Sequence, residues 1–295
     1  MDEIVGHSQA CSFFDRAISA AKLHHAYAVF GPDHVGKTVL IERVIGQILH
    51  TPSDHLDAHP DFVRVRRGVD EKTGKERTDI VVGQIHALQS ALATRPVLAP
   101  HRVAFIEEAA LLNKTGANAL LKTLEEPMSR VVIFLRTTHE SDLPKTILSR
   151  VQRVRLSLVS AEAIASMLVR LGASKKEAQE FAGASHGCPG LARTLLLHPA
   201  DHEARARDRA QFEEVLALPL AGRSLYLSRA LPKGQPRAKA LELVELWEDV
   251  LRARWHASGF GAPQTAVLQR LFQTREALQR NAPPVLALEH TLFFV

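Results

Sequence analysis

The segment from Gly31 to Thr38 constrains this chain more than any other, because it reads Gly-Pro-Asp-His-Val-Gly-Lys-Thr. It fits the phosphate-loop pattern G-x-x-x-x-G-K-[ST] at every fixed position, in which the backbone curls so that successive N–H groups point at phosphate oxygens. We expect the backbone of Gly31, Val35 and Gly36 to hold the phosphates of a nucleotide, aided by the dipole of the helix that follows. Lys37 is expected to reach the β and γ phosphates, and the Thr38 hydroxyl to bind Mg²⁺.

The residues around this loop predict the setting that the motif requires. Tyr27 to Phe30 form a short apolar run, as expected for a buried strand, and Thr38 to Ile45 continue with helical spacing. Strand, loop and helix in this order predict the fold around the loop. A glycine-rich turn that binds no ligand fits the same pattern, so nucleotide binding by this copy is a separate question that the residues leave open.

Composition excludes several kinds of protein. The 295 residues suffice for two or three domains, and no apolar run approaches the length of a membrane span. Two cysteines rule out a disulfide framework and a cysteine-rich metal site, and they fit a reducing cytosol. The start, Met1-Asp2-Glu3, has no apolar signal core, so we expect a cytoplasmic protein. A net charge of +5 permits contact with nucleic acid, whereas two Trp and two Tyr offer little for stacking on bases.

A pair of acids follows the next clear strand. Val103 to Ile106 are apolar, and Glu107 and Glu108 come directly after them. In a site for Mg²⁺ and ATP the first carboxylate, here Glu107, would hold the water shell of the metal, and the second, Glu108, would polarise the attacking water. The alternative is a strand that leaves the core into an acidic loop, and the phosphate loop upstream makes the first interpretation the stronger one.

A third polar position lies at the end of another buried strand. Val131 to Leu135 form a continuous apolar run, which is typical of a parallel strand buried on both faces, and Thr138 follows shortly after it. A polar side chain here can donate a hydrogen bond to the γ phosphate or to the attacking water. An ordinary threonine at a strand end fits equally well, and the residues do not decide between the two.

Strands alternate with helices over residues 1–158, which predicts an α/β nucleotide-binding domain with a parallel sheet covered by helices on both faces. Ligands of such sheets lie at the carboxyl ends of the strands, where the loop, the acids and Thr138 are all expected. Residues 159–199 are rich in helix formers and predict a small helical domain. Residues 200–295 predict a C-terminal domain that is entirely helical.

Four further segments resemble the bacterial clamp-loader ATPases of the AAA+ class. His24-His25-Ala26-Tyr27, ahead of the loop, is similar to the opening of those proteins. The segment from Ala117 to Pro127, which contains Leu-Leu-Lys-Thr-Leu-Glu-Glu-Pro, is close to one of their signatures, and Thr146-Ile-Leu-Ser-Arg150 looks like their serine–arginine motif. Residues 281–289 resemble the last helix of their delta-prime subunits.

The resemblance implies an AAA+ P-loop domain, a lid and a C-terminal collar that assembles subunits into a ring. Such rings belong to the DNA polymerase III holoenzyme, a nucleotidyltransferase, and place a sliding clamp on primed DNA. The implied partners are motor subunits of the gamma or tau type, the delta subunit, the clamp, and DNA through its phosphates, with no membrane contact. Arg150 of the serine–arginine motif is implied to be an arginine finger that acts in trans on the ATP site of a neighbouring motor subunit.

The chain departs from that family at three places. Residues 46–61 contain no cysteine, where many members carry a zinc site, so we expect no zinc. The first acid is Glu107 rather than the usual Asp, which moves the carboxylate outward by about one C–C bond and disturbs Mg²⁺ geometry. Gly190 stands where motor subunits carry a sensor arginine. These departures favour the delta-prime type, with ATP and Mg²⁺ possible ligands and an ATPase activity of its own that is weak or absent.

Two other classes of protein remain open on the sequence. An AAA+ remodeller or helicase loader would hydrolyse ATP itself and assemble as a homo-oligomer. A small-molecule kinase with a phosphate loop would need a substrate pocket with positioned arginines, of which residues 201–295 give no sign.

Overall fold

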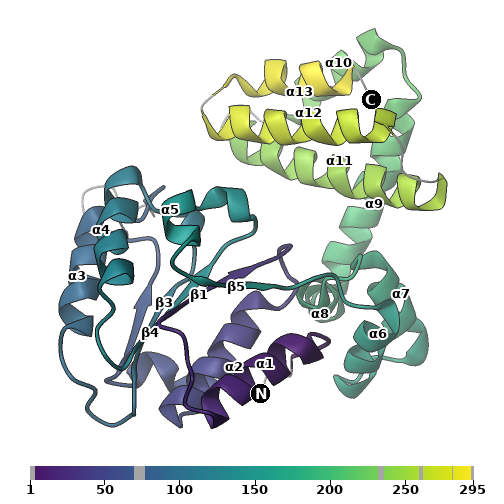
Figure 1. Cartoon of the computed structure of the whole chain (residues 1–295). Helices are drawn as coiled ribbons and strands as arrows, with labels where there is room; N and C mark the ends of the chain where they lie inside the picture. Colours follow the sequence, from purple (N-terminus) through teal and green to yellow (C-terminus); the bar gives the residue numbers. More distant parts are fainter. Residues whose placement is uncertain (1–3, 70–76, 232–235, 259–261, 281, 294–295) are drawn as a thin grey trace. The chain divides into compact units, whose positions relative to one another are not determined.

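The computed structural model describes residues 4–69, 77–231, 236–258, 262–280 and 282–293. The chain forms two compact units, residues 1–197 and 198–295, and each is drawn as a ribbon in Figure 1. No helix in the described ranges is long and apolar enough to cross a lipid bilayer.

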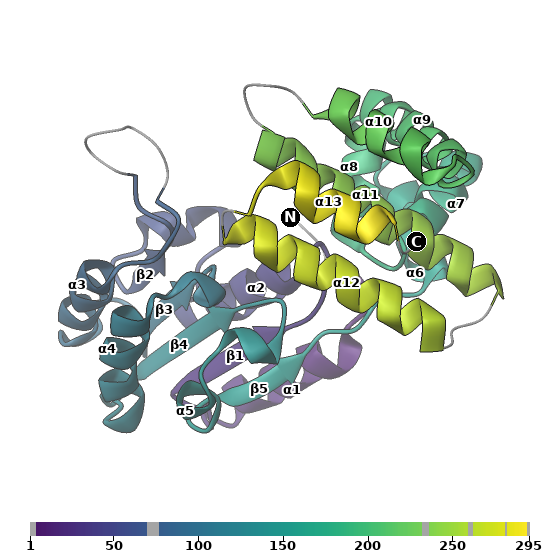
Figure 2. The same ribbon diagram turned by 90° about the horizontal axis from the view of Figure 1, so that it is seen from above.

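The first unit is built on a parallel sheet of five strands. Their order across the sheet is β2 (Phe62–Val65), β3 (Arg102–Ile106), β4 (Val131–Arg136), β1 (Ala26–Phe30) and β5 (Gln152–Arg155), as Figure 2 shows. Every residue of β1 and β3 is buried, which explains why these strands, apart from Arg102 at the start of β3, are apolar rather than alternating. The predicted parallel sheet is therefore confirmed.

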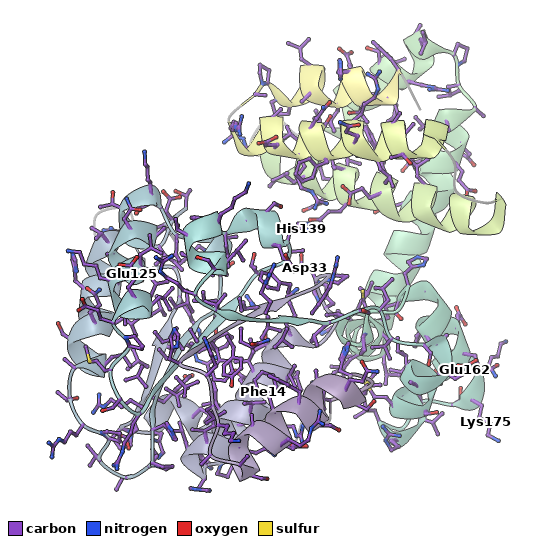
Figure 3. All side chains as sticks on the ribbon, in the orientation of Figure 1. Phe14, Asp33, Glu125, His139, Glu162 and Lys175 are labelled. Atoms are coloured by element: carbon purple, nitrogen blue, oxygen red, sulfur yellow. The ribbon has the colours of Figure 1, made fainter. Side chains whose placement is uncertain are left out.

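Helices cover both faces of this sheet (Figure 1). The helices of one face are α1 (Ser8–Ser19) and α2 (Lys37–Leu49), and those of the other are α3 (Val82–Leu92), α4 (Lys114–Glu125) and α5 (Lys145–Leu148). Within β1, Tyr27 and Val29 belong to the first core and Ala26 and Ala28 to the second. Phe14 of α1, labelled in Figure 3, is fully buried, and its ring centroid lies 5.0 Å from that of Tyr27.

Short 3-10 helices connect several of these elements: η1 (Ser53–Ala58), η2 (Ala109–Leu111) and η3 (Glu140–Asp142). Three further helices complete the first unit: α6 (Ala161–Arg170), α7 (Lys175–Ala184) and α8 (Pro189–Leu197). The Ser160 and Ser174 side chains cap the first turns of α6 and α7. These helices share a small core of their own, which also takes in Val5 and Val159.

In the described residues of the second unit, every regular element is a helix. Its helices are α9 (Pro199–Leu216), α10 (Leu220–Ala230), α11 (Pro236–Ser258), α12 (Ala262–Gln279) and α13 (Pro284–Leu292). Phe212 and Trp247 are fully buried at its centre, where their rings stack with centroids 5.1 Å apart.

Candidate functional site

The phosphate loop lies at the carboxyl edge of the sheet, between β1 and α2. Gly31 has a φ of 144°, and a Cβ there would lie 2.4 Å from the backbone oxygen of Leu156, so no other residue fits without a backbone shift. Gly36 has a φ of 109°, in the region that side chains disfavour. The Gly31 N–H donates to the Thr138 carbonyl at 3.2 Å, which ties the loop to the segment after β4.

The Lys37 ammonium lies inside the loop that precedes it. The side chain is only 6% exposed, and Nζ donates to the carbonyl oxygens of Gly31 at 2.6 Å and of Pro32 at 2.7 Å. Asp33 Oδ1 lies 3.4 Å from the same nitrogen. Burial lowers the pKa of Lys37, and the nearby Asp33 carboxylate opposes that effect. The three N–H donors of the ammonium thus all have acceptors within the loop.

Two other segments of the first unit hold the loop from outside. The N–H of Gly190, at the start of α8, donates to the His34 carbonyl at 2.8 Å. The His7 Nε2 atom lies 3.0 Å from the Val35 carbonyl oxygen. A Cβ at Gly190 would lie 3.0 Å from the His34 oxygen and 3.3 Å from its Cα, which is tight against backbone. The close approach of α8 to the loop therefore favours glycine at position 190.

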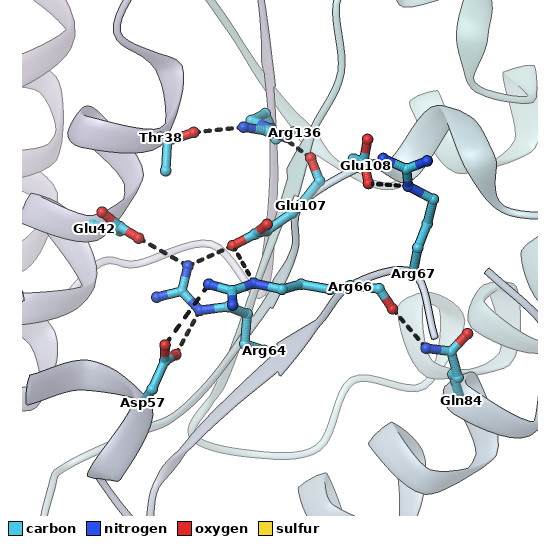
Figure 4. A network of polar contacts seen from close by, with 10 residues as sticks. All are labelled: Thr38, Glu42, Asp57, Arg64, Arg66, Arg67, Gln84, Glu107, Glu108 and Arg136. Carbon is cyan, nitrogen blue, oxygen red and sulfur yellow. Dashed lines mark hydrogen bonds and ion pairs between the residues drawn. The ribbon is translucent and has the colours of Figure 1, made fainter. Parts of the chain in front are cut away.

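An arginine contacts the hydroxyl that was expected to bind Mg²⁺. Arg136, the last residue of β4, donates from Nη1 to Thr38 Oγ1 at 2.7 Å and from Nε to the Glu107 carbonyl at 2.5 Å, as drawn in Figure 4. Its guanidinium therefore bridges the start of α2 and the end of β3, and it lies between the phosphate loop and the acidic pair.

The Glu107 carboxylate is held by two more arginines. Its Oε1 atom accepts from Arg64 Nη1 at 2.7 Å and from Arg66 Nε at 3.0 Å. Arg64 is only 9% exposed, and it also pairs with Glu42 at 2.8 Å and with Asp57 at 2.6 Å. Burial alone would lower the pKa of Arg64, but the three carboxylates hold that pKa above its usual value.

Glu108, the expected activator of water, has an arginine partner as well. Its Oε2 atom accepts from Arg67 Nε at 2.9 Å, and the side chain is about one-third exposed. The second acid is therefore engaged by a guanidinium in this arrangement, on one of the two oxygens that would face an attacking water.

The expected Mg²⁺ ligands do not fit a metal ion as they stand. Thr38 Oγ1 and the Glu107 carboxylate each lie within hydrogen-bond distance of a guanidinium. A dication bound to these oxygens would stand directly against those positive groups, and Mg²⁺ demands a nearly ideal octahedron of oxygen ligands. Across the part of the chain that the structure describes, no group of three or more His, Cys, Asp or Glu side chains could hold a metal ion.

The structure brings most of the predicted site residues to one edge. Thr138 Oγ1 donates to Asp33 Oδ1 of the loop at 3.2 Å, while its neighbour Thr137 bonds to Asp142 at 2.6 Å. Figure 3 shows Asp33 and His139, which follows Thr138, at the same end of the sheet. The loop, Thr138 and the acidic pair thus lie around one place, although their roles toward a ligand stay predictions.

Arg150 lies at the opposite edge of the sheet. It precedes β5, and the register of β5 pairs Gln152 with Tyr27 near the start of β1, whereas the loop follows the end of β1. A strand of five residues rises roughly 3.3 Å per residue, so the two edges are about 15 Å apart. Arg150 Nη2 pairs with Glu125 at 2.8 Å, and Nη1 donates to the Thr146 carbonyl at 2.9 Å.

Sequence reasoning missed the four arginines of the site, Arg64, Arg66, Arg67 and Arg136. Two of them carried a signal: Arg64 is a charge inside the four-residue strand Phe62–Val65, and Arg136 follows five apolar residues of β4. A charge in such a place needs a partner, because an unpaired buried charge is costly. The identity of that partner depends on contacts between distant parts of the chain.

Residues 6–160, more than half of the chain, match the protein family described as DNA polymerase III, delta subunit. The chain is 30% identical over 174 residues to the DNA polymerase III subunit gamma of Buchnera aphidicola subsp. Acyrthosiphon pisum, covering 56% of this chain and 47% of that protein. It is 31% identical over 187 residues to the DNA polymerase III subunit delta' of Pseudomonas aeruginosa, covering 58% and 55%. The chain thus spans about half the length of these two relatives.

The fold was also compared with solved structures. The crystal structure of a DNA polymerase III gamma subunit-related protein from Thermotoga maritima aligns with a TM-score of 0.49 and 17% identity, covering 95% of this chain and 97% of that one.

Proposed function

Since this chain belongs to the DNA polymerase III, delta subunit family, we propose that it is a stator of the delta-prime type in a clamp-loader ring. In this proposal it helps to place the sliding clamp on primed DNA in the cytoplasm, without hydrolysing ATP efficiently itself. Its neighbours are motor subunits of the gamma or tau type and the delta subunit, and it contacts DNA through phosphates. Relatives named as subunits gamma and delta' support this placement.

The observation that carries the proposal is the position of Arg150. It lies about 15 Å from the chain's own phosphate loop, at the amino edge of the sheet, so it cannot reach a phosphate bound there. Its side chain is 35% exposed and its carboxylate partner, Glu125, is 48% exposed. An exposed pair of this kind contributes little to stability, so the guanidinium can exchange Glu125 for another anion. We therefore assign Arg150 to the ATP site of a neighbouring subunit, as an arginine finger.

The chain's own loop supports a stator rather than a motor. The residues expected to bind a metal and to activate water, Thr38, Glu107 and Glu108, are engaged by arginines. The loop itself keeps Lys37 and its glycines, so we propose that it still contacts nucleotide phosphates, together with Thr138, but supports little or no hydrolysis. This arrangement disfavours the alternative of a homo-oligomeric remodeller driven by its own ATP turnover.

The two helical regions of the chain have separate roles in this proposal. Residues 159–199 are proposed as the lid over the loop, supported by the contact between Gly190 and His34. Residues 200–295 are proposed as the collar that joins the ring. The second unit exposes several large apolar side chains, which suits contact with other subunits: Leu218, Leu220, Leu225, Phe272, Val285 and Leu286.

The test is a reconstituted clamp loader that contains Arg150→Ala in this subunit. Because an arginine finger is worth roughly 10³–10⁵ in rate, we expect ATP hydrolysis at the one site that it serves to be nearly lost. Single-turnover hydrolysis of ATP by the assembled ring, with primed DNA and clamp present, measures this loss. Arg153→Ala is the matched control. Arg153 follows Arg150 closely in the sequence and is also an exposed arginine paired with a carboxylate, that of Glu140.

Assembly has to be shown for both variants by size-exclusion chromatography, so that a lost subunit is not mistaken for a lost finger. Full single-turnover amplitude in an intact Arg150→Ala ring would overturn the proposed role. A ring of the purified chain alone with strong ATPase activity would favour the homo-oligomeric remodeller instead.

A further inference from the structure

Arg136 differs from the other arginines of the site in what it binds. Arg64, Arg66 and Arg67 donate to carboxylates, whereas Arg136 donates to a hydroxyl and a backbone carbonyl, at Thr38 and Glu107. These two bonds use two of the five N–H donors of its guanidinium, and Nη2 takes part in neither. The group thus stands beside the loop with donors to spare.

The place that Arg136 takes is that of the metal. Thr38 is the loop residue whose hydroxyl binds Mg²⁺ in the phosphate-loop pattern, and Arg136 Nη1 lies 2.7 Å from that hydroxyl oxygen. A Mg²⁺ ion would lie about 2.1 Å from it. The guanidinium and a metal ion cannot both lie next to the Thr38 hydroxyl, so one of them excludes the other.

The two carboxylates of the acidic pair already have arginine partners. Figure 4 draws Glu107 against Arg64 and Arg66, and Glu108 against Arg67. A bound Mg²⁺ would add two positive charges beside carboxylates that these guanidinium groups already engage. Removal of Arg136 alone would free the Thr38 hydroxyl, which is the loop ligand that the metal needs.

We propose that the phosphate loop binds the phosphate tail of a nucleotide without a metal ion, with the Arg136 guanidinium in the place of Mg²⁺. Lys37 and the loop N–H groups contact the phosphate oxygens on one side, and the spare N–H donors of Arg136 contact them on the other. A guanidinium forms paired hydrogen bonds with phosphate oxygens, so it can replace the metal as a positive ligand. It carries no water molecules to be activated, so the bound nucleotide is held and not hydrolysed.

This inference rests on the proposal that the loop still contacts nucleotide, and it is independent of the role of Arg150. It predicts the direction in which Mg²⁺ changes the affinity for nucleotide. In a loop that uses the metal, Mg²⁺ strengthens the binding of ATP. Here the free nucleotide anion is the ligand, and Mg²⁺ removes that ligand from solution by forming its own complex. Mg²⁺ therefore weakens binding to this chain.

The experiment is equilibrium binding of a fluorescent ATP analogue to the purified full-length chain, measured by anisotropy in excess EDTA and again in millimolar Mg²⁺. We expect binding in EDTA and an affinity at least tenfold lower in Mg²⁺. Arg136→Gln should lose about tenfold or more of the EDTA affinity, because it removes a charged hydrogen bond to phosphate. The same variant should bind more tightly when Mg²⁺ is added, since the metal can then occupy its place.

Arg153→Gln is the matched control, because Arg153 is exposed and pairs with Glu140 rather than with the loop, and its binding should equal that of the unchanged chain. Arg136→Lys keeps one positive charge, so an intermediate affinity is expected even if the glutamine variant proves poorly folded by circular dichroism. Tighter binding of the unchanged chain in Mg²⁺, or no binding in either condition, would overturn the proposal. Equal affinities of Arg136→Gln and Arg153→Gln would overturn it as well.

Discussion

The two edges of the sheet use arginine in opposite ways. At the carboxyl edge Arg64 is only 9% exposed and shares three carboxylates, so its charge is fully engaged within the domain. At the amino edge Arg150 is 35% exposed and has Glu125 as its carboxylate partner. An arginine is thus structural at one edge and free to contact another molecule at the other. The two positions differ in the burial of the guanidinium and in the number of carboxylates around it.

The energetic consequences of these two settings differ by several-fold. Removing one partner from a buried ion pair costs about 3–5 kcal/mol, because the remaining charges are left without compensation. An exposed pair is worth at most about 1 kcal/mol. An arginine can move to the phosphate of another subunit only if leaving its resting partner costs little. By this criterion Arg150 can act in trans and Arg64 cannot.

The largest effect that tests this comparison is on stability. We expect Arg64→Ala to lower the free energy of unfolding of the first unit by about 3–5 kcal/mol, because it removes the arginine partner of Glu42 and leaves Asp57 and Glu107 with Arg66 alone. Arg150→Ala, the matched variant at the other edge, should lower it by less than about 1 kcal/mol. Urea unfolding followed by circular dichroism measures both. Equal losses for the two variants would break the comparison.

A smaller effect shows that the amino edge is nevertheless anchored. Asp61, just before β2, is fully buried and accepts from the backbone N–H groups of Val97 at 2.7 Å, Leu98 at 2.7 Å and Ala99 at 2.9 Å. Burial would raise the pKa of Asp61, but these hydrogen bonds, with Arg102 nearby, bring that pKa below its usual value. The carboxylate therefore stabilises the fold in its charged form.

We expect Asp61→Asn to cost about 2 kcal/mol at neutral pH, because the new amide group would face a backbone N–H donor. The contribution of the carboxylate is complete above its unfolded pKa of about 3.9 and is lost as the pH falls through the lower folded value. The gap between the unfolding curves of the two proteins should therefore narrow below about pH 4. A gap that stays constant down to acid pH would show that charge on Asp61 is not the cause.

The general plan of the first unit followed from the sequence for a physical reason. Apolar strands separated by helical segments can bury both faces only in a parallel sheet, and in such a sheet the carboxyl ends of the strands share one edge. From this rule the sequence alone predicted that the phosphate loop, the acidic pair and Thr138 lie at the same edge. The serine–arginine motif likewise drew attention to Arg150, although its role is still a prediction.

The arginines that engage the acids and Thr38 could not be predicted in the same way. Arg136 and Thr38 are 98 positions apart, and Arg64 and Glu107 are 43 apart, so their contacts depend on the register of neighbouring strands and not on local pattern. The contact of Gly190 with the His34 carbonyl is of the same kind. A charged residue within a short apolar strand indicates that it has a partner of opposite charge or polarity, but only the folded structure shows which residue that partner is.

The most direct test of the central claim places Lys37→Ala and Arg150→Ala of this subunit in the same reconstituted clamp loader and compares DNA-stimulated ATP turnover. We expect Lys37→Ala to leave turnover close to that of the unchanged ring, because this subunit's own loop hydrolyses little or no ATP. We expect Arg150→Ala to lower turnover severely, because a neighbouring subunit loses its arginine finger. A severe loss with Lys37→Ala and none with Arg150→Ala would contradict the account and make this chain a motor.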